Sequence, residues 1–174
     1  MPLIVNRGTG GDFEPAPEGP HPARCCDVRD LGRIETHYPG RKKLQRKILV
    51  SWVIDAVRAD GKPALVAKRY TASLHEKAML RADLEAWRGK AFSESELDAF
   101  DVETVIGAPV LLNVVHVKKN GVTYANVQSL MPLPRGMQAP GIPSSYVRWV
   151  DRDENAAATE EDAPPPLSDD DIPF

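Results

Sequence analysis

The chain has 174 residues, a length that suits one domain of ordinary size with terminal extensions. Its formal net charge of −3 combines two unlike parts: residues 151–174 carry nine acidic residues and one basic residue, and the other 150 carry 21 basic and 16 acidic residues. A basic body with a separate acidic segment indicates an anionic ligand for the body, and no apolar run approaches the ~18 residues of a membrane span, so we expect no membrane partner.

The first 21 residues are rich in Gly and Pro, which predicts an extended leader without a core. The apolar start, Met1 to Val5, is too short for a signal peptide, so we expect a cytoplasmic protein. Cys25 and Cys26 are adjacent and the chain has no Cys-x-x-Cys, which favours two reduced thiols over a zinc or redox site.

The first half of the body reads as strands. β-Branched and alternating apolar residues predict strands over these ranges: 24–33, 43–56 and 64–71. Gly32 indicates a bulge or bend inside the first of them. Tyr38-Pro39-Gly40 and Asp60-Gly61 are turn signals, so the three strands should follow one another directly.

The second half begins with a helix. Ser73 and Glu76 form a capping box that predicts its start, and Gly89 predicts its end. A second capping box, Ser93 with Glu96, predicts a short helical turn that continues through residue 99. Two further strands are predicted on either side of the hairpin signal Asn120-Gly121, over the ranges 110–118 and 122–130.

Three strands, a helix and two strands define a mainly β protein. This order fits the five-stranded OB-fold barrel, with one helix between strands three and four, although the same elements could also form an α+β sheet. We therefore predict three parts: a leader over 1–21, an OB-fold domain over 22–134 and a flexible acidic tail over 135–174. OB-folds bind single-stranded nucleic acid on the face of strands two and three and with the adjacent loops.

Basic and aromatic residues coincide where that fold would bind a strand. The turn between strands one and two carries a cluster with an adjacent ring: Arg41, Lys42, Lys43, Arg46, Lys47 and Tyr38. Strand three adds Lys68, Arg69 and Tyr70, and the last hairpin adds Lys118, Lys119 and Tyr124. Cations spaced along a groove pair with phosphates and rings stack on bases, so all twelve are candidate DNA contacts. The alternatives are a charged hairpin that prevents edge pairing and a core position for Tyr70.

The other aromatic residues have simpler readings. Trp52 and Trp87 lie on apolar faces of a strand and the helix, and we interpret both as core residues. A short apolar group interrupts the polar tail, and it either docks on the body or forms a second contact motif: Tyr146, Val147, Trp149 and Val150. No arrangement of nucleophile, base or paired carboxylates indicates catalysis, and we expect no metal, nucleotide or other cofactor.

The sequence ends on a distinctive tip, Asp169-Asp170-Asp171-Ile172-Pro173-Phe174. A partner pocket can bury the Phe174 ring while a basic rim attracts the three carboxylates. The tip resembles the acidic C-terminal tip of bacterial single-stranded DNA-binding proteins. That resemblance implies that these six residues recruit replication, recombination and repair proteins.

The body resembles a group of phage and prophage proteins that are regarded as single-stranded DNA-binding proteins. The resemblance rests on the following stretches: residues 73–78, 83–89, 107–109, 124–127 and 132–134. The body does not resemble the core of the tetrameric bacterial protein, which argues against that tetramer here and leaves a homodimer as an alternative. Together the two resemblances imply a phage protein that coats single-stranded DNA without sequence preference in a bacterial host cell.

Two alternatives come from other classes of function. The first is an interaction protein whose tip competes for host enzymes while its body binds no DNA. The second is a nuclease that uses the tip as a targeting tag, which should carry a carboxylate cluster for metal.

Overall fold

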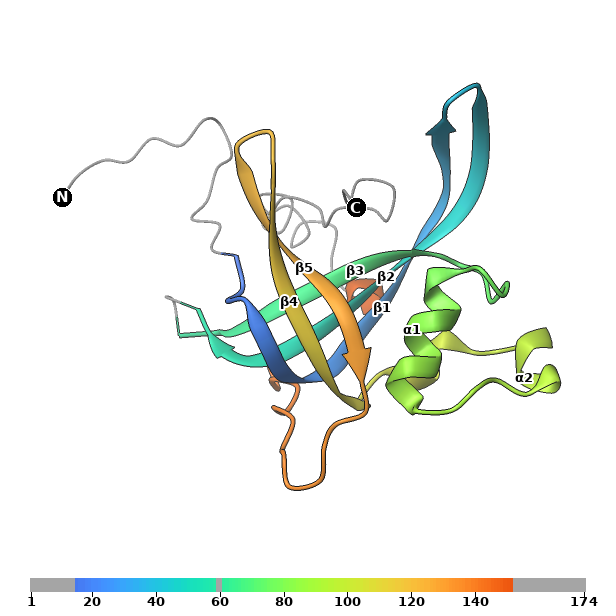
Figure 1. Ribbon diagram of the computed structural model, residues 1–174. Coiled ribbons are helices and arrows are strands. Elements are labelled where there is room, and N and C mark those ends of the chain that lie inside the picture. The colour runs from blue at the N-terminus through green and yellow to red at the C-terminus, as the bar shows by residue number, and fades with distance from the viewer. Residues whose placement is uncertain (1–14, 59–60, 152–174) are drawn as a thin grey trace.

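The computed structural model describes residues 15–58 and 61–151 (Figure 1). Five antiparallel strands form one sheet in the order β3-β2-β1-β4-β5. The strands are β1 (Gly19–Tyr38), β2 (Arg41–Val57), β3 (Pro63–Thr71), β4 (Pro109–Lys119) and β5 (Val122–Met131). The helical elements are α1 (Met79–Arg88), α2 (Glu94–Asp98), η1 (Val102–Val105) and η2 (Trp149–Asp151). The described part of the chain is thus mainly β with few helices, as predicted, and its sheet is not closed, because no ladder joins the edge strands β3 and β5.

Strand β1 is the longest and has two neighbours. Its first residues, 19–24, pair with β4, and residues 23–38 pair with β2. The predicted strand covered residues 24–33, so the structure extends it by five residues at each end, and the added start includes Pro20 and Pro22. At these two positions β1 pairs only with β4, so residues without an N–H are tolerated.

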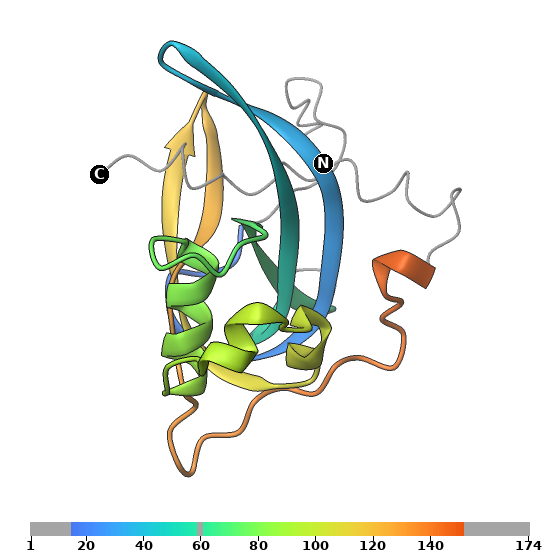
Figure 2. The same ribbon diagram turned by 90° about the vertical axis from the view of Figure 1, so that its right-hand side faces the viewer.

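Two irregularities bend β1. The register with β2 shifts between Cys25 and Asp27 and again between Asp30 and Gly32. Gly32 has φ 74° and its N–H donates to the Asp30 carboxylate at 2.9 Å, so the predicted bulge at Gly32 is confirmed. Bulges increase the local twist, and the sheet curls so that β4 and β5 face β1 and β2 (Figure 2).

Two of the three predicted turns between strands are confirmed, and the third, Asp60-Gly61, lies partly outside the described residues. Gly40 joins β1 to β2 with φ 79°, and Asn120 and Gly121 join β4 to β5 with φ 53° and 77°. In the β4–β5 hairpin both central residues have positive φ, which is the geometry that matches the twist of two paired strands, whereas in the β1–β2 hairpin Gly40 follows Pro39 and alone has positive φ. Both hairpins rise at the same end of the sheet, at the top of Figure 1.

The core lies between the curled sheet and α1. Trp52 on β2 is fully buried, Trp87 on α1 is 7% exposed, and their ring centroids are 5.9 Å apart. The Trp87 indole N–H donates to the Pro109 carbonyl at 2.8 Å, which ties the helix to the start of β4. Both tryptophans are core residues, as predicted.

The predicted start of the first helix is wrong. α1 begins at Met79 after Ala78, whose side chain does not cap it. The Ser73 hydroxyl instead accepts a bond from the His75 N–H at 3.1 Å, because a serine can close a local turn as readily as it caps a helix. The predicted end is confirmed, since Gly89 follows the helix with φ 73°.

The second capping box is confirmed, although α2 ends at Asp98, one residue earlier than predicted. The Ser93 hydroxyl accepts from the Glu96 N–H, and the Glu96 carboxylate accepts from the Ser93 N–H. Arg88 and the Ser93 N–H together lower the pKa of Glu96 to about 2, so the box keeps its charge.

Candidate nucleic-acid interface

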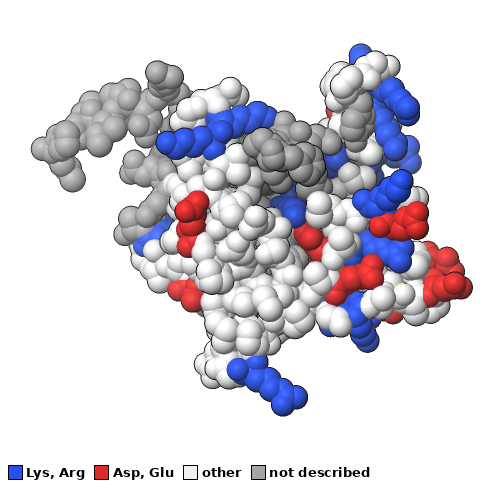
Figure 3. Space-filling model, viewed as in Figure 1, with Lys and Arg blue, Asp and Glu red and all other residues white. Residues whose placement is uncertain are grey.

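The hairpin of β1 and β2 carries the densest positive charge. Arg41, Lys42, Lys43 and Arg46 are all exposed there, and Tyr38 ends β1 opposite Arg41 in the register. Figure 3 shows Lys and Arg side chains over this hairpin and over the tip of the β4–β5 hairpin. The structure therefore keeps most of the predicted cluster at the surface.

Alternation along β2 divides these four cations into two pairs. Lys42 and Arg46 lie on one face, and each has an acidic neighbour on β1: Glu35 at 3.5 Å and Asp30 at 2.5 Å. Arg46 and the Gly32 N–H lower the pKa of the Asp30 carboxyl, which keeps the second pair charged. Arg41 and Lys43 lie on the other face, and no carboxylate of the described residues pairs with them.

The face that carries Arg41 and Lys43 continues along β2 to Leu49, away from the core. In the register, Leu49 lies between Arg29 of β1 and Arg69 of β3. We call this surface of β1, β2 and β3 the outer face. At about 3.3 Å per residue, its cations from Arg41 to the Arg29–Leu49–Arg69 row span roughly 26 Å along β2.

Three of the predicted contacts are buried instead. Lys68 and Tyr70 do share a face of β3, as alternation predicts, but it is the core face. The Asp83 carboxylate of α1 accepts bonds there from the Lys68 ammonium at 2.9 Å and the Tyr70 hydroxyl at 2.6 Å. Tyr70 is 1% exposed, so its predicted stacking on a base is wrong and the core alternative holds. Lys47 is also buried, with its ammonium 2.7 Å from the Thr71 hydroxyl.

The β4–β5 hairpin supplies a smaller set. Lys118 is exposed, and Lys119 and Tyr124 are half-buried. Tyr124 lies opposite Val117, so Tyr124 and Lys119 share one face of the hairpin and Lys118 lies on the other. The structure places the β4–β5 hairpin, which carries these three residues, at the same end of the sheet as the cationic β1–β2 hairpin (Figure 1).

A segment after β5, residues 140–151, lies against β1, and we call it the strap. Figure 2 shows it outside the sheet, next to β1 and ending in η2. Arg24 donates to the Pro140 carbonyl at 3.0 Å, and Arg29 lies 3.5 Å from the centre of the Trp149 ring. The apolar group of the tail therefore docks on the body, which was one of the two readings of the sequence.

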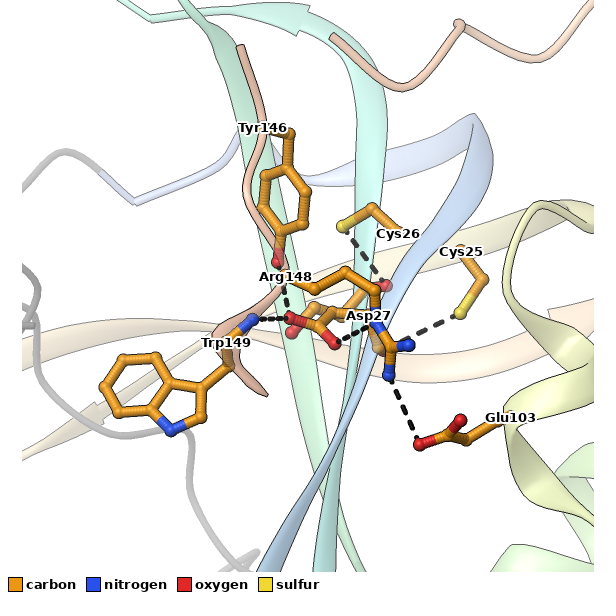
Figure 4. A network of polar contacts seen from close by, with 8 residues as sticks. Cys25, Cys26, Asp27, Glu103, Tyr146, Arg148 and Trp149 are labelled. Carbon is orange, nitrogen blue, oxygen red and sulfur yellow. Dashed lines mark hydrogen bonds and ion pairs between the residues drawn. The ribbon is translucent and has the colours of Figure 1, made fainter. Parts of the chain in front are cut away.

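A buried carboxylate holds the strap. Asp27 of β1 is 3% exposed and accepts three bonds from the strap (Figure 4). The donors are the Tyr146 hydroxyl at 2.9 Å, the Trp149 N–H at 2.7 Å and the Arg148 guanidinium at 3.3 Å. Burial raises the pKa of the Tyr146 phenol, so it stays protonated and keeps donating. Arg148 also reaches Glu103 at 3.3 Å, which joins the strap to η1.

The sequence analysis did not select Arg29 or Asp27, although docking of the strap's apolar group was one of its two alternatives. The bulge at Cys26 shifts the alternation, so Cys25 and Val28 face the core while Asp27 and Arg29 face outward. A strict period of two places Asp27 on the face of Cys25 and gives no reason to select it. The predicted tip, residues 169–174, lies outside the described residues.

No family model matches the sequence, and no curated protein matches it.

The described residues contain no group of three or more His, Cys, Asp or Glu side chains arranged to hold a metal ion. None of their helices is long and apolar enough to cross a membrane.

Proposed function

We propose that the protein binds single-stranded DNA without sequence preference and recruits replication, recombination and repair proteins through residues 169–174. The observation that supports DNA binding is the set of cations on the outer face. Arg41, Lys43 and Arg69 are there without carboxylate partners among the described residues, and the cation of Arg29 joins them. Cations spread along β2 and its two neighbouring strands suit a phosphate backbone.

We propose further that the curled sheet is a partly open OB-fold barrel. Three features support this. β1 pairs with both β2 and β4, the edge strands β3 and β5 lie in contact, and α1 follows β3 in the chain and touches both edges. In such a barrel the face of strands two and three and the loops 1–2 and 4–5 bind the strand. Those loops correspond here to the two hairpins that rise together in Figure 1.

The chemistry of this surface favours binding without sequence preference. Cations bind any phosphate and ring faces stack on any base, whereas recognition of a particular base sequence needs polar groups aimed at base edges. The resemblance of the body to phage single-stranded DNA-binding proteins, and of the tip to the bacterial ones, supports a role in phage DNA replication and recombination.

The direct test is a titration of the full chain with a fluorescent dT oligonucleotide at several salt concentrations. We expect saturable binding, and a slope of log affinity against log salt of about −3, from roughly −0.7 for each of four to five phosphates. A duplex of the same length is the control and should bind more weakly. If no binding occurs even at low salt, the proposal is wrong and the interaction protein becomes the better reading.

Deleting Ile172-Pro173-Phe174 should weaken partner binding at least about tenfold, because a buried aromatic anchor often carries most of a small interface. The probe is a bacterial enzyme that binds the acidic tip of the host's own single-stranded DNA-binding protein, measured by titration. DNA affinity should stay level, because the deletion leaves the cations of the outer face in place.

The matched control deletes Ala156-Ala157-Ala158, which shortens the tail equally and keeps the tip. This control should bind both the enzyme and DNA as the full chain does. Loss of DNA binding with retained enzyme binding in the tip deletion would reverse the two roles.

A further inference from the structure

We infer that copies of this chain associate head to tail, with Leu44 on the β1–β2 hairpin of one copy seated in an apolar cavity of the next copy. The contact needs no DNA, so it goes beyond the proposed function. Its two halves, the hairpin and the cavity, both consist of described residues.

An apolar cavity opens where α1 and η1 meet the start of β4 and the residues after β5. Its volume is about 420 Å³. Apolar side chains form most of its wall, among them Trp87, Phe100 and Leu133. Thr104 and Pro109 also line it and are exposed, so the cavity can be reached from the surface. Its size and lining suit one inserted aliphatic or aromatic side chain.

The segment that supplies one wall of the cavity is acidic. Residues 91–107 carry five acidic residues and no basic one. Arg88, the basic residue of the wall, is already paired with Glu96 at 2.9 Å. Three of the five acids are exposed, and no basic side chain of the described residues pairs with them: Glu94, Asp98 and Asp101. The cavity therefore suits an apolar side chain that is flanked by cations.

Leu44 is a side chain of this kind. It is 60% exposed near the end of the β1–β2 hairpin. Alternation places it on the same face of β2 as Lys42 and Arg46, and Arg33 of β1 lies opposite Arg46 in the register. Arg33 is exposed, and no carboxylate of the described residues pairs with it. Burying Leu44 in a cavity of another copy would remove its apolar surface from water, which is favourable.

The hairpin and the cavity lie too far apart to meet within one copy. Pro109 of the cavity pairs with Arg24 of β1, and Arg24 pairs with Val53 of β2. Leu44 precedes Val53 by nine residues, which is roughly 30 Å along β2. Figure 1 accordingly shows the hairpin at the top and the start of β4 near the bottom. The contact must join two copies, and contacts between unlike surfaces build open chains or rings.

The two faces of the hairpin would then have different ligands. Leu44 lies on the face of β2 opposite to Arg41 and Lys43, which belong to the outer face. A hairpin seated in a neighbouring copy therefore keeps these two cations for phosphates. Copies joined in this way can follow one another along a strand, so binding to long single-stranded DNA should be cooperative.

Sedimentation velocity of the full chain without DNA tests the association. The mean sedimentation coefficient should rise with protein concentration at low salt and rise less at high salt, because exposed charges are screened. Leu44→Asp should weaken the association at least about tenfold, since it replaces the apolar anchor with a carboxylate that faces an acidic segment. No association of the unmodified chain at low salt, or equal association of Leu44→Asp, would overturn the inference.

Val57→Asp is the matched control for this variant. Val57 also belongs to β2, is 68% exposed and lies at the other end of the strand, so this variant should associate as the unmodified chain does. Leu44 is exposed too, so Leu44→Asp should keep the urea midpoint of the unmodified chain. If it does not, Leu44→Ser takes its place, because it removes the anchor without adding a charge.

Mixing two variants tests the head-to-tail arrangement. Leu44→Asp keeps its cavity, whereas Thr104→Trp places a large ring in the cavity and keeps its hairpin. Each variant alone should stay monomeric. An equal mixture should form a heterodimer and nothing larger, because one intact hairpin meets one intact cavity. A mixture that stays monomeric would show that the hairpin and the cavity do not bind each other.

Titration with dT oligonucleotides separates this inference from the proposed function. Leu44→Asp should bind a short oligonucleotide with nearly unchanged affinity, because Arg41 and Lys43 remain, and should bind a long one without cooperativity. If the unmodified chain associates but binds no DNA, the proposed function fails and the inference stands. If it binds DNA but does not associate, the inference alone fails.

Discussion

Replacing Asp83 with Ala should lower the free energy of unfolding by about 3–5 kcal/mol, because it leaves a buried cation without its partner. Lys68 and Asp83 have side chains that are only 7% and 12% exposed, and their charged atoms are 2.9 Å apart. The Tyr70 hydroxyl also loses its acceptor, at 2.6 Å in the structure. Urea unfolding, with midpoints compared at a constant m-value, measures the loss.

Glu85→Ala is the matched control on the same helix. Its carboxylate pairs with Arg81 at 2.9 Å in an i,i+4 arrangement that is partly exposed, so its loss should cost about 0.5 kcal/mol or less. The double variant Lys68→Met with Asp83→Leu should be more stable than Asp83→Ala, because it removes both charges together. If Asp83→Ala and Glu85→Ala lower the free energy of unfolding equally, the buried pair contributes no more to stability than the exposed one.

The double variant Arg41→Ala with Lys43→Ala should flatten the salt slope of dT binding by about 1.4 units, or roughly 0.7 for each lost phosphate contact. That change corresponds to an affinity about 25-fold lower at 0.1 M salt, taking 1 M as the reference. Both residues are exposed on the outer face, and neither pairs with a carboxylate of the described residues, so we expect little effect on stability. Polarisation titrations at several salt concentrations measure the slope.

The control variant Lys42→Ala with Arg46→Ala removes the same charge from the same hairpin. Its residues lie on the opposite face of β2 and are already paired with Glu35 and Asp30. The slope of log affinity against log salt should change by less than half as much as it does in Arg41→Ala with Lys43→Ala. Equal effects of the two variants would mean that total charge governs binding and that the outer face is not the site.

Local signals in the sequence predicted the turns and most of the strands. Gly40, Asn120 and Gly121 adopt positive φ, which Gly and Asn tolerate better than other residue types, so these residues between two strand patterns indicated the hairpins. The Ser93–Glu96 box also succeeded, because both of its bonds are made within four residues. Ser73–Glu76 failed because the same residue types can also close a turn.

The candidate site was predictable only in part. Arg41, Lys42, Lys43 and Arg46 are exposed as expected, because a projecting hairpin end has no core to bury them. Lys68 and Tyr70 were selected for a chemistry that their burial does not allow. Alternation showed that they share a face, but it carried no information about which face, and only the packing of α1 supplied Asp83 as their partner.

The sequence by itself determined a mainly β chain with two tight hairpins and a cationic hairpin end, because turn geometry and alternation depend on neighbouring residues. Only the tertiary structure decided which cations face outward and that the strap covers β1. The bonds that fix this arrangement join Asp27 to Tyr146 and Arg148, more than a hundred positions away in the chain. A bulge of one residue at Cys26 turns Asp27 and Arg29 toward the strap, and a register shift of this kind follows from how whole strands pair.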